Sequence, residues 1–338
     1  MNILFELNHP AHYHYFKNFI KYLQEENHFV LIVSREKDVL LNLLEHDKIN
    51  HITISKPSKG MIGNLMELVS RIFKLLKLNN KYHFDIAFGT ISCSYLTLFS
   101  NVKSFLTIDD DDNLIRLLVY LAFPFCSKIL QPDYIHPTIL KNKRVFFNSY
   151  LKLGHLHPNV FQPDISVLKN YNLQSRRFII IRLSAMKAFH DTGAVGLSND
   201  LISQIVNIAN KLNIIFSYEN KKTFQIKPWD MHHVMSFAAM VISDSQTMSA
   251  EAALLGVPSI RYNSFVGKIS FHEELEHRYG LTYGYRPGQE KEMLERIKKL
   301  LEMENVYEIW SKRKEKMLSE KVDFTSWLIY YFEKEIKK

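Results

Sequence analysis

A run of small polar residues in the second half of the chain follows an apolar strand and leads straight into good helix formers. The backbone N–H groups of Gln246, Thr247 and Met248 would stand free at the helix start, where the helix dipole favours a phosphate group. Ser245 precedes them, and the Glu251 carboxylate one turn further on could accept hydrogen bonds from two ribose hydroxyls. These residues predict a binding corner for a nucleoside diphosphate. The alternative is N-capping by Ser245 or Thr247, with Glu251 as a solvated helix charge.

Arg182 and Ser184 directly follow another apolar strand of the same half. A guanidinium at that position could pair with a diphosphate through two hydrogen bonds, and an interdomain salt bridge is its alternative role. His190 continues the same loop as a candidate contact to phosphate or sugar. Asp191 could orient His190 or cap a helix.

Three histidines lie between the first strand and the first helix. His9 and His12 are candidates for taking a proton from a hydroxyl group, whereas His14 is expected to orient or pack. A metal site is the less favoured alternative, because this spacing in a loop would need a carboxylate from elsewhere.

Four aspartates, residues 109–112, follow a later strand of the first half. Asp109 is the catalytic candidate, because a carboxylate among acidic neighbours has a raised pKa. For Asp111 and Asp112 a helix-capping role is preferred.

Strand-like apolar runs alternate with helical patterns along both halves of the chain. Strands are expected at residues 3–7, 29–33, 51–54, 84–88, 105–108, 178–181, 214–217, 240–242 and 259–261. Helices are expected at residues 13–23, 36–44, 61–78, 113–122, 201–212, 232–238, 247–255, 291–303, 306–318 and 324–337. Such alternation gives parallel α/β sheets, and it places every candidate above at the carboxyl edge of a sheet.

The length of 338 residues favours two domains. We expect an N-terminal domain at residues 1–160 that carries the acceptor and catalytic groups. A C-terminal domain at 161–322 would bind the nucleotide, and a helix at 323–338 could cross back to the first domain.

Composition narrows the class of protein. Two cysteines without metal-site spacing, no signal-peptide pattern and no run of eighteen apolar residues predict a cytoplasmic location. The net charge of +8 suits a phosphorylated ligand or an anionic membrane, and the scattered basic residues argue against nucleic acid.

One helical stretch, residues 60–78, carries a stripe of Met, Ile, Leu, Val and Phe with interleaved Lys and Arg. A core-facing helix is the favoured interpretation. A helix that rests on an anionic membrane is the alternative.

Several motifs resemble those of known proteins. Asp244-Ser245-Gln246-Thr247 with Glu251 resembles the donor corner of GT-B fold proteins, particularly the UDP-N-acetylglucosamine 2-epimerases, although Gln246 and Thr247 replace paired glycines. More closely, the chain resembles the family known as domain of unknown function 354. The segments that carry this second resemblance are residues 8–16, 147–158, 182–191, 243–251 and 256–265.

The resemblance implies two Rossmann-like α/β domains that face each other across a cleft. It also implies a nucleobase site near Glu219 and Ile226, for which a plain surface loop is the alternative. His232 and His233 could approach the phosphates, although capping or packing is favoured for at least one of them.

The implied function is a metal-independent glycosyltransferase of polysaccharide biosynthesis. It would need no cofactor and would transfer a sugar from a nucleotide, UDP in the first instance, to a cell-surface glycan or lipid-linked acceptor, with peripheral contact at the inner face of the membrane. The alternatives are a UDP-N-acetylhexosamine 2-epimerase, non-hydrolysing or hydrolysing, and a catalytically silent nucleotide-sugar binding protein.

Overall fold

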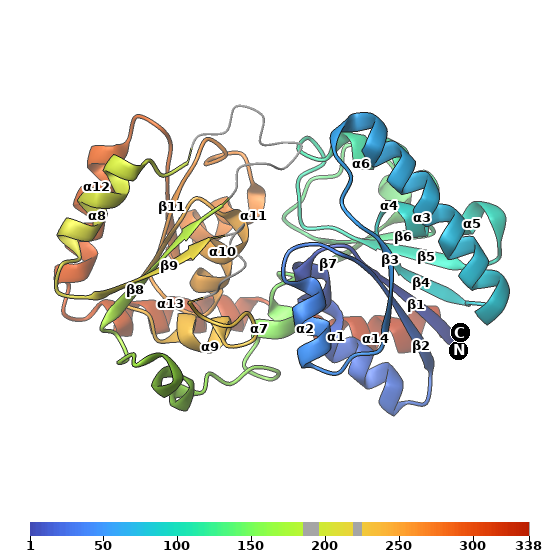
Figure 1. Cartoon of the computed structure of the whole chain (residues 1–338), viewed down its shortest axis with the longest axis horizontal. Helices are drawn as coiled ribbons and strands as arrows, with labels where there is room; N and C mark the ends of the chain where they lie inside the picture. Colours follow the sequence, from blue (N-terminus) through green and yellow to red (C-terminus); the bar gives the residue numbers. More distant parts are fainter. Residues whose placement is uncertain (185–195, 219–224, 338) are drawn as a thin grey trace. The chain divides into compact units, whose positions relative to one another are not determined.

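The computed structural model describes residues 1–184, 196–218 and 225–337, and these residues form two compact units (Figure 1). Unit 1 comprises Met1–Val160 and Val322–Lys338, and unit 2 comprises Phe161–Lys321. Position 190 and position 219, which the sequence analysis singled out, lie outside the described residues. Each unit is built on its own parallel sheet.

The sheet of unit 1 has seven strands in the order β3-β2-β1-β4-β5-β6-β7, and each neighbouring pair is parallel. Their bounds are β1 Asn2–Leu7, β2 Phe29–Arg35, β3 His51–Ser55, β4 Ile86–Gly89, β5 Lys103–Thr107, β6 Lys128–Pro132 and β7 Arg144–Phe147. The helices are α1 Pro10–Glu25, α2 Leu40–His46, α3 Gly60–Tyr82, α4 Ile91–Ser94, α5 Leu96–Phe99, α6 Arg116–Leu121, α7 Leu153–Leu156 and α14 Phe324–Tyr331. The strand order reverses direction between β1 and β4, and ligands of such sheets usually bind at the carboxyl ends of the strands at that point.

Helices cover both faces of the sheet in unit 1 (Figure 1), and successive side chains of β1 pack on opposite faces. Leu4 packs into a core with Leu75 of α3 and Leu96 of α5. Phe5 faces the other way, with its ring 5.4 Å from that of Phe16 in α1. A strand buried on both faces reads as a continuous apolar run, which is how the first residues of the chain read.

The sheet of unit 2 has five parallel strands in the order β12-β11-β10-β8-β9. Their bounds are β8 Phe178–Leu183, β9 Asn213–Tyr218, β10 Met240–Ser243, β11 Ser259–Tyr262 and β12 Thr282–Tyr285. The helices are α8 Asn199–Ile208, α9 Met231–Ser236, α10 Gln246–Leu254, α11 Ser270–Glu273, α12 Glu290–Glu302 and α13 Val306–Glu320. The switch of strand order lies between β8 and β10.

The last seventeen residues belong to unit 1. Phe324 of α14 lies 4.9 Å from Phe147 between ring centres, and Phe332 lies 5.6 Å from Phe19. Thr325 donates a hydrogen bond to the carbonyl of Gly154. A Cβ at Gly154 would come within 2.9 Å of the Phe324 ring and 2.8 Å of a backbone oxygen, so this contact needs glycine.

Several short elements differ from the sequence prediction. Strands β6, β7 and β12 were not predicted, because they have only four or five residues and carry Gln, Pro, Arg or Gly within them. The helix expected from residue 113 begins at Arg116, since Asp112 is engaged elsewhere, as described below.

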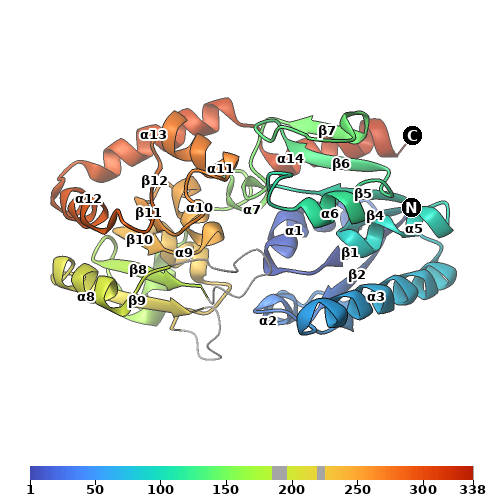
Figure 2. The ribbon, with the colours of Figure 1, turned by 90° about the horizontal axis from the view of Figure 1, so that it is seen from above.

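The favoured interpretation of the apolar stripe in α3 is wrong. Most apolar residues of the stripe are exposed, with Met61 and Ile62 both at 74% and Phe73 at 68%. The helix itself lies along the outside of unit 1 (Figure 2). The buried face of α3 consists instead of Glu67, Arg71, Leu75 and Asn79. None of the helices within the described residues is long and apolar enough to cross a membrane.

Candidate functional site

The carboxyl ends of β8 and β10 meet at the switch point of unit 2, where Asp244 connects them. Its carboxylate accepts a hydrogen bond from the backbone N–H of Ser184 at 2.6 Å. Burial raises the pKa of Asp244, and the Asn263 side chain donates to its carbonyl. Arg182 lies at the same edge and donates to the Ser217 hydroxyl at 2.8 Å. The structure therefore brings Arg182 and Ser184 to the same strand ends as the polar run.

Helix α10 begins at Gln246, and Ser245 is its N-cap residue. The Ser245 side chain makes no capping bond to α10, so the capping alternative fails for this residue. The backbone N–H of Ser245 donates a hydrogen bond to the Ser243 hydroxyl at 2.8 Å. Thr247 is half-buried and Met248 is buried. The first N–H groups of a helix have no partner in a preceding turn, so this start can receive an anion.

The side chain of Gln246 is held by Arg261 at the end of β11. Arg261 is completely buried, and its Nη1 donates to Gln246 Oε1 at 2.8 Å. A guanidinium has no acceptor, so the Gln246 oxygen must face Arg261 and its NH2 group must occupy the opposite branch of the amide. No described residue accepts a hydrogen bond from that NH2 group. The first residue of α10 thus offers two side-chain donor protons in addition to its backbone.

The carboxylates of Glu276 and Glu273 lie near Arg261, but neither is hydrogen-bonded to it. The Nε and Nη2 of Arg261 make no hydrogen bond to the described residues, and the Glu273 carboxylate lies 3.9 Å from Nη2. Burial lowers the pKa of Arg261 to about 10, which still leaves it charged at neutral pH. A buried cation beside a helix N-terminus strengthens the attraction of this corner for anions.

Glu251 is buried, and its carboxylate lies 3.3 Å from Nε2 of His232. The interpretation of Glu251 as a solvated helix charge is therefore wrong. His233 instead accepts a hydrogen bond from the Asp164 backbone and packs 4.9 Å from the Phe161 ring. The preference for packing thus holds for His233, whereas His232 lies within the polar corner of α10.

Ile226 lines an open pocket of about 430 Å³ together with Tyr171, Gln225 and the first half of β9. Its side chain is almost completely buried, and Gln225 accepts a hydrogen bond from the Phe216 N–H. The pocket lies along the outer edge of β9. It is not at the carboxyl end where Arg182 and Asp244 meet.

In unit 1, His9 and His12 both lie at the carboxyl end of β1. His9 is the N-cap of α1, and its Nδ1 accepts from the Ala11 N–H at 3.2 Å. His12 Nδ1 accepts from the Asn8 N–H at 3.3 Å, so the proton of the neutral ring is on Nε2. Burial lowers the pKa of His12 to about 4. In this arrangement His12 is a hydrogen-bond donor and a poor base.

Asp109 lies beside His12 in this unit. Its Oδ2 accepts from Lys152 Nζ at 2.9 Å and from the Tyr15 hydroxyl at 3.2 Å. The Tyr15 ring lies 6.4 Å from that of His12. Lys152 therefore pairs with the Asp109 carboxylate at this edge of the sheet.

Asp110 follows Asp109 in the chain, and its side chain is exposed. Partial loss of hydration at the sheet edge and the charge of Asp109 raise its pKa to about 7. A raised pKa was expected from the sequence for Asp109, one residue away. For Asp112 the helix-capping interpretation is wrong, because its carboxylate binds Arg144 at 2.6 Å and the Thr138 N–H at 2.8 Å.

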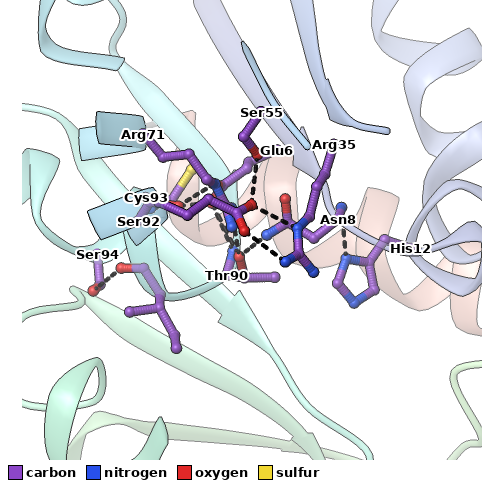
Figure 3. A network of polar contacts seen from close by, with 12 residues as sticks. Glu6, Asn8, His12, Arg35, Ser55, Arg71, Thr90, Ser92, Cys93 and Ser94 are labelled. Carbon is purple, nitrogen blue, oxygen red and sulfur yellow. Dashed lines mark hydrogen bonds and ion pairs between the residues drawn. The ribbon is translucent and has the colours of Figure 1, made fainter. Parts of the chain in front are cut away.

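A buried network at the β1–β4 switch point was not predicted (Figure 3). The Glu6 carboxylate is completely buried and accepts hydrogen bonds from Arg71, Ser92 and the backbone N–H groups of Thr90 and Cys93. Burial alone would raise the pKa of Glu6, but the charge of Arg71 and these hydrogen bonds outweigh it and lower the pKa to about 2.

Asn8 connects this network to the histidines. Its amide donates to the Thr90 hydroxyl, while its backbone N–H holds His12 (Figure 3). A lone Glu within an apolar strand was the one signal in the sequence, since a buried carboxylate needs partners.

Solved structures of low sequence identity share this architecture. The S. aureus MnaA–UDP co-structure has a TM-score of 0.69 at 11% identity, over 98% of this chain and 96% of that one. UDP-GlcNAc 2-epimerase from Methanocaldococcus jannaschii has a TM-score of 0.65 at 14% identity, over 90% and 94%. A glycosyltransferase from Rickettsia africae has a TM-score of 0.61 at 13% identity, over 98% of both chains. The protein therefore has the GT-B fold of nucleotide-sugar epimerases and glycosyltransferases.

A family model identifies the chain more closely. The model described as "Protein of unknown function (DUF354)" matches residues 1–269, so the chain belongs to this family. The resemblance found in its sequence motifs is confirmed. A search of curated proteins gives no match.

Proposed function

We propose that the protein is a glycosyltransferase that takes a sugar from a nucleoside diphosphate, UDP in the first instance. The observation that carries this proposal is the corner of unit 2, where α10 begins with the donor group of Gln246 held by a buried arginine. The same edge holds Arg182 and, one helical turn into α10, the buried Glu251. The MnaA co-structure with UDP, which has the same fold, supports uracil as the first base to test.

The chemical role of this corner is to stabilise the leaving diphosphate. In glycosyl transfer, negative charge develops on the phosphate oxygen as the sugar departs. Fixed N–H donors and a nearby cation stabilise that charge without reorganising during the reaction. The set we assign to this task comprises the backbone N–H groups of Gln246, Thr247 and Met248, the Gln246 amide and the Arg182 guanidinium. Glu251, Ser184 and Ser245 are the candidates for the ribose and the sugar. Ile226, which lines the pocket along β9 away from this edge, is the candidate for the base.

Activation of the acceptor is assigned to the carboxyl edge of the sheet in unit 1. Asp110, with a pKa of about 7, can take a proton from a hydroxyl at neutral pH. His12 and His9 are reassigned as groups that orient the acceptor, because the Nδ1 atom of each already accepts a backbone hydrogen bond. No metal or cofactor enters this proposal.

An epimerase is the second candidate. The neighbouring carboxylates of Asp109 and Asp110, one neutralised by Lys152 and the other with a raised pKa, suit removal and return of a proton on a sugar carbon. Both reactions use the same nucleotide corner. A catalytically silent protein would keep that corner without turnover.

The acceptor we propose is a cell-surface glycan or a lipid-linked sugar, handled in the cytoplasm with peripheral contact at the membrane. Purified full-length protein, incubated with a panel of nucleotide sugars and an acceptor extract, should release nucleoside diphosphate only when the extract is present. Release of an epimerised sugar without extract would favour the second candidate. Binding without either product would favour the third.

A further inference from the structure

Helix α3 turns polar side chains toward unit 1 and apolar side chains toward solvent, which is the reverse of an ordinary surface helix. The side that packs on unit 1 carries Glu67 and Arg71, which pair with Arg35 and Glu6. The opposite side carries a continuous row of exposed apolar residues: Met61, Ile62, Leu65, Met66, Val69 and Phe73, with exposed fractions from 43% to 74%. These positions recur every three or four residues, so they share one face and extend along roughly 18 Å of helix.

The core of unit 1 does not explain this face. Buried ion pairs occupy the inner side of α3, so its attachment to the unit is complete without the outer row. The neighbouring helix α5 contacts α3 and adds exposed Leu98 and Phe99. An apolar surface of this extent on one helix and its neighbour marks a surface for another molecule.

The charges around the row distinguish between possible partners. Lys59 and Lys77 flank the row at its two ends, and Lys81 lies beyond Lys77; all three are exposed. Lys56 is exposed as well, but it pairs with Glu36 at 2.8 Å. The one acidic residue between positions 56 and 82 is Glu67, which is buried and paired. A second copy of this face would bring lysines against lysines, whereas an anionic bilayer complements both the apolar row and the cations.

We infer that α3 and α5 dock unit 1 onto an anionic phospholipid bilayer. The helix lies in the plane of the headgroups, with its Met, Leu, Ile and Phe side chains among the acyl chains and its lysines at the phosphates. Combined with the proposed function, on which this last step rests, the docking selects a lipid-linked acceptor over a soluble glycan.

Vesicle sedimentation of the full-length protein, without nucleotide, tests this inference. Vesicles of phosphatidylcholine with 30% phosphatidylglycerol should sediment the protein at least ten-fold more strongly than phosphatidylcholine alone. The triple variant Ile62→Gln, Met66→Gln, Phe73→Gln should lose at least ten-fold of that binding. Ile165→Gln replaces an apolar residue of unit 2 that is 58% exposed, and it should bind as the parent does.

A charge variant separates the contribution of the lysines to vesicle binding from that of the apolar row. Lys59→Glu with Lys77→Glu should weaken binding to the anionic vesicles, and the exposed Lys169→Glu should not. Failure of the parent to sediment with anionic vesicles, or equal sedimentation of parent and triple variant, would overturn the inference. So would a change from dimer to monomer in the triple variant by light scattering, which would assign the face to a second copy.

A measurement of nucleotide binding distinguishes failure of the membrane docking from failure of the proposed function. UDP stabilisation of the triple variant should equal that of the parent, because no residue of α3 belongs to the nucleotide corner. Loss of vesicle binding with UDP binding intact concerns this inference alone. Vesicle binding without any nucleotide binding would leave the docking surface in place and remove the proposed function.

Discussion

Gln246 and Thr247 replace the glycine pair of the epimerase pattern, and the structure shows how the larger side chain of Gln246 is accommodated. Arg261 holds the Gln246 oxygen, which leaves the amide NH2 as a donor at the start of α10. The motif alone could not reveal this, because Arg261 is fifteen residues away and reaches Gln246 only through the pairing of β10 with β11.

Gln246→Glu should weaken nucleotide binding without damaging the fold. The new carboxylate still accepts from Arg261, now as a charge-assisted bond, but it presents an anion instead of NH2 to the diphosphate. We expect at least a ten-fold loss of UDP affinity by calorimetry, with an unchanged or raised Tm. Gln174→Glu, at an exposed position, is the matched control. Unaltered UDP affinity in Gln246→Glu would remove Gln246 from the site.

Asp110→Asn should lower kcat by about 10²–10⁴, the usual contribution of a general base. Because Asp110 has a pKa of about 7 and must be ionised to accept a proton, kcat/KM should rise as the pH increases through 7. This rise of kcat/KM with pH should vanish in Asp110→Asn and persist in Asp111→Asn. If the rise survives in Asp110→Asn, another residue is the base.

Among elements, α4 and the end of β1 depend on the Glu6 network. The folded-state pKa of Glu6 is about 2, below its ordinary value of 4.5, so its charged form is stabilised. This contribution is present above pH 4.5 and is lost as the pH falls through 2. By linkage, such a shift corresponds to about 3 kcal/mol.

Glu6→Gln should therefore reduce the free energy of unfolding at pH 7 by about 3 kcal/mol, because it also leaves the Arg71 charge buried without a counterion. Urea unfolding at pH 7 and pH 3 measures this. The parent should lose stability between these pH values by more than the variant does. An equal pH dependence in both proteins would show that Glu6 titrates normally in the folded state.

Prediction of these elements from the sequence succeeded where apolar periodicity was strong. The strands β1, β4, β8 and β10 and the helices α1, α3 and α10 were all expected. It failed for β6, β7 and β12, where strands of four or five residues contain polar residues or proline. It also misassigned the faces of α3, because a periodic stripe shows that a helix is amphipathic but not which face is covered.

Site residues were likewise predicted where they come directly after an apolar strand. These candidates lie at the carboxyl edges of their sheets: Arg182, Ser184, His12 and Asp109. Lys152, Tyr15 and Arg261 were missed, because their roles arise from tertiary contacts that no local spacing encodes.

On the scale of the whole molecule, the chain returns to unit 1 after completing unit 2, and its last segment completes the core of unit 1. Phe324, Leu328 and Phe332 are all completely buried. Deleting residues 322–338 should unfold unit 1, because the loss of three such side chains at about 3 kcal/mol each approaches the total stability of a domain. Circular dichroism and limited proteolysis should show this loss, and deletion of residues 337–338 should have no effect. A truncated protein that melts as the parent does would contradict this role of α14.

Unit 2 is proposed to bind a nucleoside diphosphate, and calorimetric titration of the full-length protein with UDP, GDP, CDP and ADP tests this binding most directly. We predict saturable binding of at least one of them, with UDP the tightest, and a stabilisation of about 2.7 kcal/mol at a hundred times the Kd. Glu251→Gln, which keeps the shape of a buried side chain, should weaken this binding. Absence of binding for all four nucleotides, in a protein shown to be folded, would contradict the account.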